Sequence, residues 1–123
     1  MTQVEVRAED QQRINEFGNL NSQCTALKMD LEALEKKKRD YEDSHEEVEL
    51  LDGMEDTTLY QMGTTFIEIP LDTAMERIDE DLQDIQKDIE SVKGKIAEKE
   101  ARMAELRSVL YGRFGRDQIN LGD

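Results

Sequence analysis

Few residues in this 123-residue chain are of types that could carry out chemistry. Cys24 is the only cysteine, so an internal disulfide is impossible. Lys99 could activate the Cys24 thiol if the two side chains met, although a small apolar filler is the commoner role for such a cysteine. His45 is the only histidine and occupies a helix-packing position opposite Ile78, which favours a tolerated packing residue over a proton shuttle. We therefore predict that the chain is not an enzyme.

Two other patterns could suggest a bound ion or nucleotide. Gly94-Lys95 lies within an expected helix and has no glycine-rich loop before it, so it is not a phosphate cradle. An acidic cluster lacks the alternating oxygen-ligand spacing of a calcium loop. Its members are Glu46, Glu47, Glu49, Asp52, Glu55 and Asp56. We expect a solvated acidic face, with no metal and no cofactor.

The charge of the chain limits its partners. A net charge of −14 and a pI near 4.4 disfavour nucleic acid and anionic membranes as ligands. No apolar run approaches the roughly 18 residues that a membrane span needs. Met1–Asp10 is polar and has no hydrophobic signal segment. These features indicate a soluble protein of the cytoplasm.

Apolar residues recur with alternating spacings of three and four in both halves of the chain, which is the heptad pattern of coiled coils. The first series runs from Phe17 to Val48 and the second from Met75 to Leu110. Disorder is the alternative for a chain with 37% charged residues, but disordered chains do not keep such a phase. We predict helices at 10–51 and 73–114, with Thr73 and Glu76 forming a capping box, and a tail at 115–123.

The segment between the helices has a different pattern. Residues 57–70 are rich in β-branched and aromatic side chains around Gly63-Thr64, which predicts a two-residue β-hairpin. Pairing across the turn places Tyr60, Met62, Ile67 and Ile69 on one face, and Leu59 and Phe66 on the other. An isolated hairpin with so much apolar surface is marginal in water, so it needs a partner.

Charge matching selects one antiparallel register for the helices. It places Leu34 opposite Ile89 and Leu27 opposite Ile96. The flanking charges then pair as Asp30 with Lys95, Lys37 with Asp88, and Lys28 with Glu100. A shift of one heptad brings like charges together, although each pair contributes only tenths of a kcal/mol.

The same register places polar residues between the helices near their free ends. Asp10 faces Arg113, while Ile14 and Phe114 flank the packing positions. One interpretation is a small exposed apolar patch that grips another chain. The other is that Ile14 and Phe114 pack on each other, with Ile119 and Leu121 folded over them.

Three segments together resemble a known family. They are EDQQRINEF at 9–17, LYQMGTTFIEIP at 59–70 and LYGRFGRDQINL at 110–121. Their order around two heptad arms resembles prefoldin, most closely its β-type subunits, over nearly the whole chain as one domain, 1–123. The family often has Asp or Asn after the hairpin glycine, where this chain has Thr64.

The resemblance implies a heterohexamer of two α-type and four β-type subunits, whose hairpins form a β-barrel body. Its coiled-coil arms hold non-native actin and tubulin chains without ATP and deliver them to the cytosolic chaperonin. The implied assembly residues are Tyr60, Met62, Phe66, Ile67 and Ile69. The implied client-binding residues are Ile14, Phe17, Leu110, Tyr111 and Phe114. Two alternatives remain open: a coiled-coil spacer or tether, and an acidic module that binds basic proteins.

Overall fold

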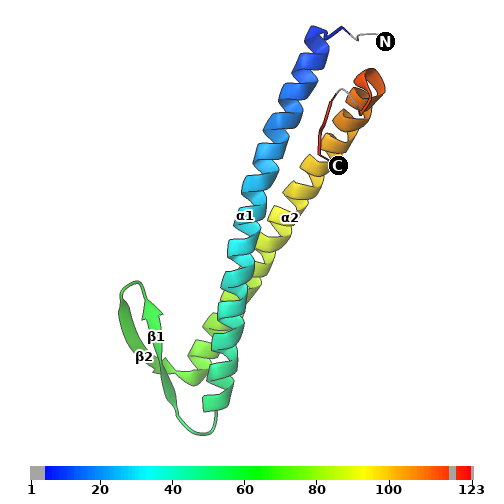
Figure 1. Ribbon diagram of the computed structural model, residues 1–123. Helices are drawn as coiled ribbons and strands as arrows, with labels where there is room; N and C mark the ends of the chain where they lie inside the picture. Colours follow the sequence, from blue (N-terminus) through cyan, green and yellow to red (C-terminus); the bar gives the residue numbers. More distant parts are fainter. Residues whose placement is uncertain (1–4, 117–118, 123) are drawn as a thin grey trace. The chain divides into compact units, whose positions relative to one another are not determined.

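The computed structural model describes residues 5–116 and 119–122. The chain forms helix α1 at Ala8–Leu51, strands β1 at Thr57–Met62 and β2 at Thr65–Pro70, and helix α2 at Leu71–Phe114 (Figure 1). This confirms the predicted fold class, a mainly α chain with two long antiparallel helices joined by a single β-hairpin. The chain divides into two compact units. We call them the terminal unit, Met1–Asp30 with Val92–Asp123, and the hairpin unit, Leu31–Ser91.

Both helices begin two residues earlier than the sequence predicted. Arg7 is the N-cap of α1, because its carbonyl accepts the first helical hydrogen bond from Gln11 and its N–H is bound by the Asp10 carboxylate at 3.0 Å. At α2, the Leu71 N–H donates to the carbonyl of Asp56 at 3.0 Å. The capping box at Thr73 was wrong, because Thr73 lies inside the first turn of α2.

The hairpin has the predicted register. Tyr60 pairs with Ile67, and Met62 with Thr65, which leaves Gly63-Thr64 as a two-residue loop. Gly63 has a φ of +62°, and among the residues that the structure describes only glycines have a positive φ. Positive φ at the first loop residue alone is the pattern of a type II′ turn. Thr64 is therefore compatible with the turn, because only a type I′ turn would need Asn, Asp or Gly there.

Each unit has its own apolar core, made by the heptad positions of its helix segments. In the terminal unit the buried cluster is Phe17, Cys24, Met103 and Leu106, with Leu20 and Leu121 packed against it. In the hairpin unit it is Val48, Leu71 and Ile78, with Tyr41, Leu51, Met75 and Leu82 around it. Full burial of one such apolar side chain contributes about 1.5–3 kcal/mol, so packing within each unit is the main stabilising term.

Neither α1 nor α2 carries an apolar stretch that would cross a membrane. Within residues 5–116 and 119–122, no three His, Cys, Asp or Glu side chains come together as metal ligands would.

Candidate functional site

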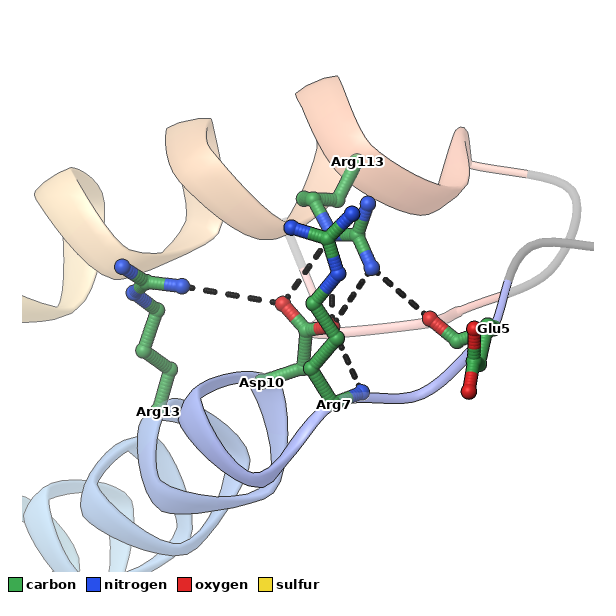
Figure 2. A network of polar contacts seen from close by, with 5 residues as sticks. All are labelled: Glu5, Arg7, Asp10, Arg13 and Arg113. Carbon is green, nitrogen blue, oxygen red and sulfur yellow. Dashed lines mark hydrogen bonds and ion pairs between the residues drawn. The ribbon is translucent and has the colours of Figure 1, made fainter.

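In the terminal unit, the ends of the two helices are joined by a buried carboxylate and an arginine. The Asp10 side chain is 1% exposed, and its Oδ2 accepts a hydrogen bond from Arg113 Nη2 at 2.7 Å. The Arg113 Nε lies 3.1 and 3.2 Å from the two Asp10 oxygens, and Nη2 also donates to the Glu5 carbonyl at 2.7 Å (Figure 2). Arg13 lies 3.6 Å from Asp10 on the other side. The predicted Asp10–Arg113 contact is confirmed.

These contacts set the charge state of Asp10. The hydrogen bond from Arg113, followed by that from the Arg7 N–H, lowers the pKa of Asp10 from 3.8 to about 2, although burial opposes the shift. The same contact raises the pKa of Arg113. Asp10 is therefore an anion at neutral pH that ties α1 to α2 and caps α1 at once.

Two further ion pairs in the terminal unit agree with the antiparallel register. Arg102 binds Glu16 with two hydrogen bonds of 2.6 and 3.0 Å, which lowers the pKa of Glu16. Lys28 lies 3.1 Å from Glu100, as predicted. The predicted pairing of Asp30 with Lys95 does not form an ion pair among the described residues, and the same holds for Lys37 with Asp88 in the hairpin unit.

The five residues assigned to client binding by resemblance all lie in the terminal unit, but their exposure differs. Phe17 and Leu110 are buried, and Leu110 is fully covered at 0% exposure. Ile14, Tyr111 and Phe114 are half-buried. Two neighbours that resemblance did not assign, Val6 and Val109, are exposed at 58% and 45%. The helix ends thus carry apolar side chains that the two helices cover incompletely.

After α2, the tail turns back along the helix (Figure 1). Gly115, with a φ of +77°, ends the helix, and its N–H donates to the Tyr111 carbonyl at 2.8 Å. Further on, Leu121 packs against the core cluster of the terminal unit. The interpretation that places Ile119 and Leu121 over Ile14 and Phe114 stays a prediction, because the partners of Leu121 are the residues of this cluster. Sequence reasoning missed Arg107, which binds the tail through backbone carbonyls that no residue pattern marks.

Two single residues with potential chemistry have partners other than those predicted. Cys24 Sγ lies 3.8 Å from Met103 Sδ in the buried core. Lys99 instead donates to Gln23 at 2.8 Å, because its long side chain extends to the surface. Cys24 is thus an apolar core residue.

His45, in the hairpin unit, pairs with carboxylates. Its Nε2 lies 3.2 Å from Asp79, the residue after Ile78, and its Nδ1 lies 3.5 Å from Glu49. Both carboxylates are more than half exposed. The contacts of His45 are therefore solvated ones between helix side chains.

The hairpin exposes most of its apolar side chains. Leu59 and Phe66 on one face are 67% and 60% exposed, and Met62 and Ile67 on the other are 50% and 39% exposed. Tyr60 and Ile69 are half-buried. An apolar surface of this kind on a two-stranded sheet with two open edges is suited to strand pairing with another chain.

A groove runs between the hairpin and the helix ends inside the hairpin unit. Its volume is about 460 Å³, and its walls come from α1, both strands and α2. The apolar lining residues include Tyr41, Val48, Leu59, Tyr60, Phe66 and Ile78. Burial and the nearby Asp81 charge raise the pKa of Tyr41, which keeps its phenol neutral. The groove therefore offers a partner a mixed wall, in which these apolar side chains alternate with polar ones such as Ser44, Gln61 and the acidic Glu47.

Comparison with known proteins gives a consistent result. The family model described as "Prefoldin subunit" matches residues 11–117. The chain is 32% identical to a probable prefoldin subunit 4 of Schizosaccharomyces pombe, over 98% of this chain and 99% of that protein. It is 31% identical to prefoldin subunit 4 of Homo sapiens, over 96% of this chain and 87% of that protein.

A solved structure shares the fold. The crystal structure of the prefoldin beta subunit from Thermococcus strain KS-1 superposes with a TM-score of 0.80, covering 91% of this chain and 97% of that one. The sequence identity is 10%, so the similarity concerns the fold alone.

Proposed function

Because the chain belongs to the prefoldin subunit family, we propose that it acts as one subunit of a heterohexameric holding chaperone that works without ATP. The complex contains two α-type and four β-type subunits and operates in the cytoplasm. It binds non-native proteins of the actin and tubulin class at the helix ends of the terminal unit and passes them to the cytosolic chaperonin.

Family membership by itself establishes the general role of the chain. The chain is a chaperone subunit, and members of its family are not enzymes, in agreement with the sequence prediction. Its partners include other prefoldin subunits. Its similarity to relatives named subunit 4 and to a β-type structure agrees with the resemblance found in the sequence.

The hairpin supports assembly as its role. Exposed Leu59, Met62 and Phe66 would be covered if strands of neighbouring subunits paired with β1 and β2. At about 25 cal/mol for each Å² of apolar surface removed from water, covering several such side chains would contribute several kcal/mol. The hairpin residues proposed for this contact remain Tyr60, Met62, Phe66, Ile67 and Ile69.

The client-binding part rests on one observation, the incomplete cover of apolar side chains at the helix ends. Ile14, Tyr111 and Phe114 are half-buried there, beside exposed Val6 and Val109. A spacer or tether has no use for such residues. Phe17 and Leu110 are buried in the chain, so they would support this surface from beneath.

Weak apolar contacts are suited to holding and release without an energy source. A patch of a few half-buried side chains binds weakly by itself, but several subunits that engage one client together gain avidity. Each contact still dissociates quickly, so the client can transfer when a stronger acceptor is present.

The test replaces Ile14 and Phe114 with serine in the assembled complex. We expect helicity and assembly to remain, and suppression of the aggregation of denatured actin, followed by light scattering, to weaken several-fold. A matched control replaces Gln12 and Gly112 with serine, because Gln12 is exposed and Gly112 has open space for a Cβ. Suppression equal to that of the control would contradict the proposed client-binding role.

Salt separates this function from that of an acidic module for basic proteins. Charge-driven binding by a chain of net charge −14 would collapse in about 1 M salt, where the screening length falls to ~3 Å. We expect capture of denatured actin to persist under these conditions.

A further inference from the structure

The tail of the chain is held by side chains that bind its backbone. Arg107 Nη2 donates to the carbonyls of Leu121 and Gly122 at 3.5 and 3.3 Å. The Leu121 N–H donates to the Tyr111 hydroxyl at 3.2 Å. These contacts reach the tail backbone, and the Arg116 guanidinium of the tail also lies 5.1 Å from the centre of the Tyr111 ring. The tail is therefore bound mainly through its backbone, which turns where the Gly122 N–H donates to Asn120 Oδ1 at 3.0 Å and Gly122 has a φ of +63°.

One apolar side chain of the tail is recognised as well. Leu121 packs against the core cluster built from Phe17, Cys24, Met103 and Leu106, beside Leu20. The Arg107 guanidinium lies 5.5 Å from the centre of the Phe17 ring, so the group that binds the tail backbone is itself held by this cluster. The side chains that bind the tail backbone, Arg107 and Tyr111, and the apolar seat of Leu121 thus lie together on one surface of the terminal unit.

The surface extends past the end of the described tail. A hollow of about 410 Å³ lies beside Gly122. Its other lining residues are Asn21, Cys24, Thr25, Lys28, Glu100, Met103, Ala104 and Arg107. A segment longer than the tail would therefore have room to continue between α1 and α2.

We propose that this surface, made by Phe17, Leu20, Met103, Leu106, Arg107 and Tyr111, is a binding groove for unfolded polypeptide segments, and that residues 119–122 occupy it in the chain as an intramolecular competitor. The ligand is a stretch of unfolded chain that places one aliphatic side chain at the position of Leu121. This inference rests on the proposed function, for which it identifies the kind of client segment and a means of regulation.

The tail is suited to be displaced. Its seat is shallow, since Leu121 and Ile119 are only half-buried and Asn120 is exposed. Ordering these residues costs conformational entropy that the few long hydrogen bonds offset only in part. A client segment that fills both the seat and the adjoining hollow would compete effectively, whereas short or polar segments would not. The tail thus limits occupancy of the groove to segments with enough apolar contact.

The experiment uses the full-length chain and a fluorescein-labelled peptide with the sequence of residues 117–123, followed by fluorescence anisotropy. Leu121→Asp should release the tail and tighten peptide binding by about tenfold, the ratio expected if the tail occupies the groove nine-tenths of the time. Asn120→Asp adds the same charge at the exposed neighbouring residue and should leave the affinity unchanged. Leu121→Gly is a second way to release the tail without adding a charge.

Arg107→Gln and Tyr111→Phe, each combined with Leu121→Asp, test whether the peptide is bound by the same groups as the tail. Both should reverse the gain in affinity while circular dichroism shows unchanged helicity. A peptide with Asp at the leucine position should not bind. The proposal is overturned if Leu121→Asp and Leu121→Gly bind the peptide no better than wild type, or if Arg107→Gln leaves the gain intact.

Client assays separate this inference from the function on which it rests. One outcome is that peptide binding follows the predicted pattern while the complex fails to suppress actin aggregation. That result would refute the proposed function but support the proposed binding groove. Normal suppression with no effect of the Leu121 variants on peptide binding would refute the groove alone.

Discussion

The two units differ in how completely each one pairs its own charged side chains and covers its own apolar side chains. In the terminal unit Asp10 is held by Arg113 and Glu16 by Arg102, and Leu110 is fully covered. In the hairpin unit, strands β1 and β2 leave Leu59 and Phe66 more than half exposed. The same chain thus contains one region with a nearly complete core and one with an apolar surface still open.

This difference indicates where the chain depends on other subunits. A surface that exposes large apolar side chains beside open strand edges is stable only when it is covered, and a hairpin alone is marginal in water. Helix ends that are tied by a buried ion pair need no such cover. We infer that assembly acts through the hairpin, while the terminal unit keeps its structure within the chain and uses a few remaining apolar side chains for weak contacts.

The largest expected effect comes from a charge in the hairpin. Ile67→Asp should weaken association with the other prefoldin subunits by roughly 1,000-fold, because an unpaired carboxylate in an apolar interface costs several kcal/mol. Native mass spectrometry measures the assembly, and circular dichroism should show most of the helix signal retained. Thr64→Asp adds the same charge at the exposed turn and should assemble. Normal assembly of Ile67→Asp would remove the role given to the hairpin.

A smaller effect is expected from the core of the terminal unit. Leu110→Ala should lower the free energy of unfolding by about 2–5 kcal/mol, because it leaves a cavity at a fully covered position. Val109→Ala, at the 45% exposed neighbour, should cost less than about 1 kcal/mol. Urea unfolding measures both. Equal losses for the two variants would show that the helix ends are frayed and not packed.

The smallest effect concerns pH. The pKa of Asp10 in the folded chain, about 2, lies below its ordinary value of 3.8, so its ionised form stabilises the fold at every pH above about 4. This contribution disappears as the pH falls from 4 through 2. The thermal stabilities of wild type and Asp10→Asn should therefore differ at pH 7 and converge near pH 2. Glu9→Gln controls for charge number in the same turn, and a constant difference across this range would contradict the Asp10 assignment.

Much of the fold was predictable because it follows from periodic patterns. Heptad spacing gave the two helices, and Gly63 with flanking β-branched residues gave the hairpin and its register. Charge matching gave the Asp10–Arg113 and Lys28–Glu100 contacts. These predictions are correct because one helix or strand register determines many residue pairs at once.

Contacts that depend on a single side chain's reach were less predictable. Helix position alone had placed Lys99 opposite Cys24. In the structure Lys99 extends to Gln23, and Cys24 contacts Met103 instead. The seat of Leu121 is defined by hydrogen bonds from Arg107 to backbone carbonyls, which have no signature in the sequence. The start of α2 at Leu71 follows from a backbone bond to Asp56 that residue types do not encode.

Hydrogen–deuterium exchange of the chain alone and in the assembled complex tests the difference between the two units most directly. We predict that amides of residues 57–70 exchange at least about tenfold more slowly after assembly, because new strand pairing protects them. Amides of residues 8–17 and 103–114 should keep their rates. Unchanged exchange in the hairpin, with slower exchange at the helix ends, would contradict the assignment of assembly to the hairpin.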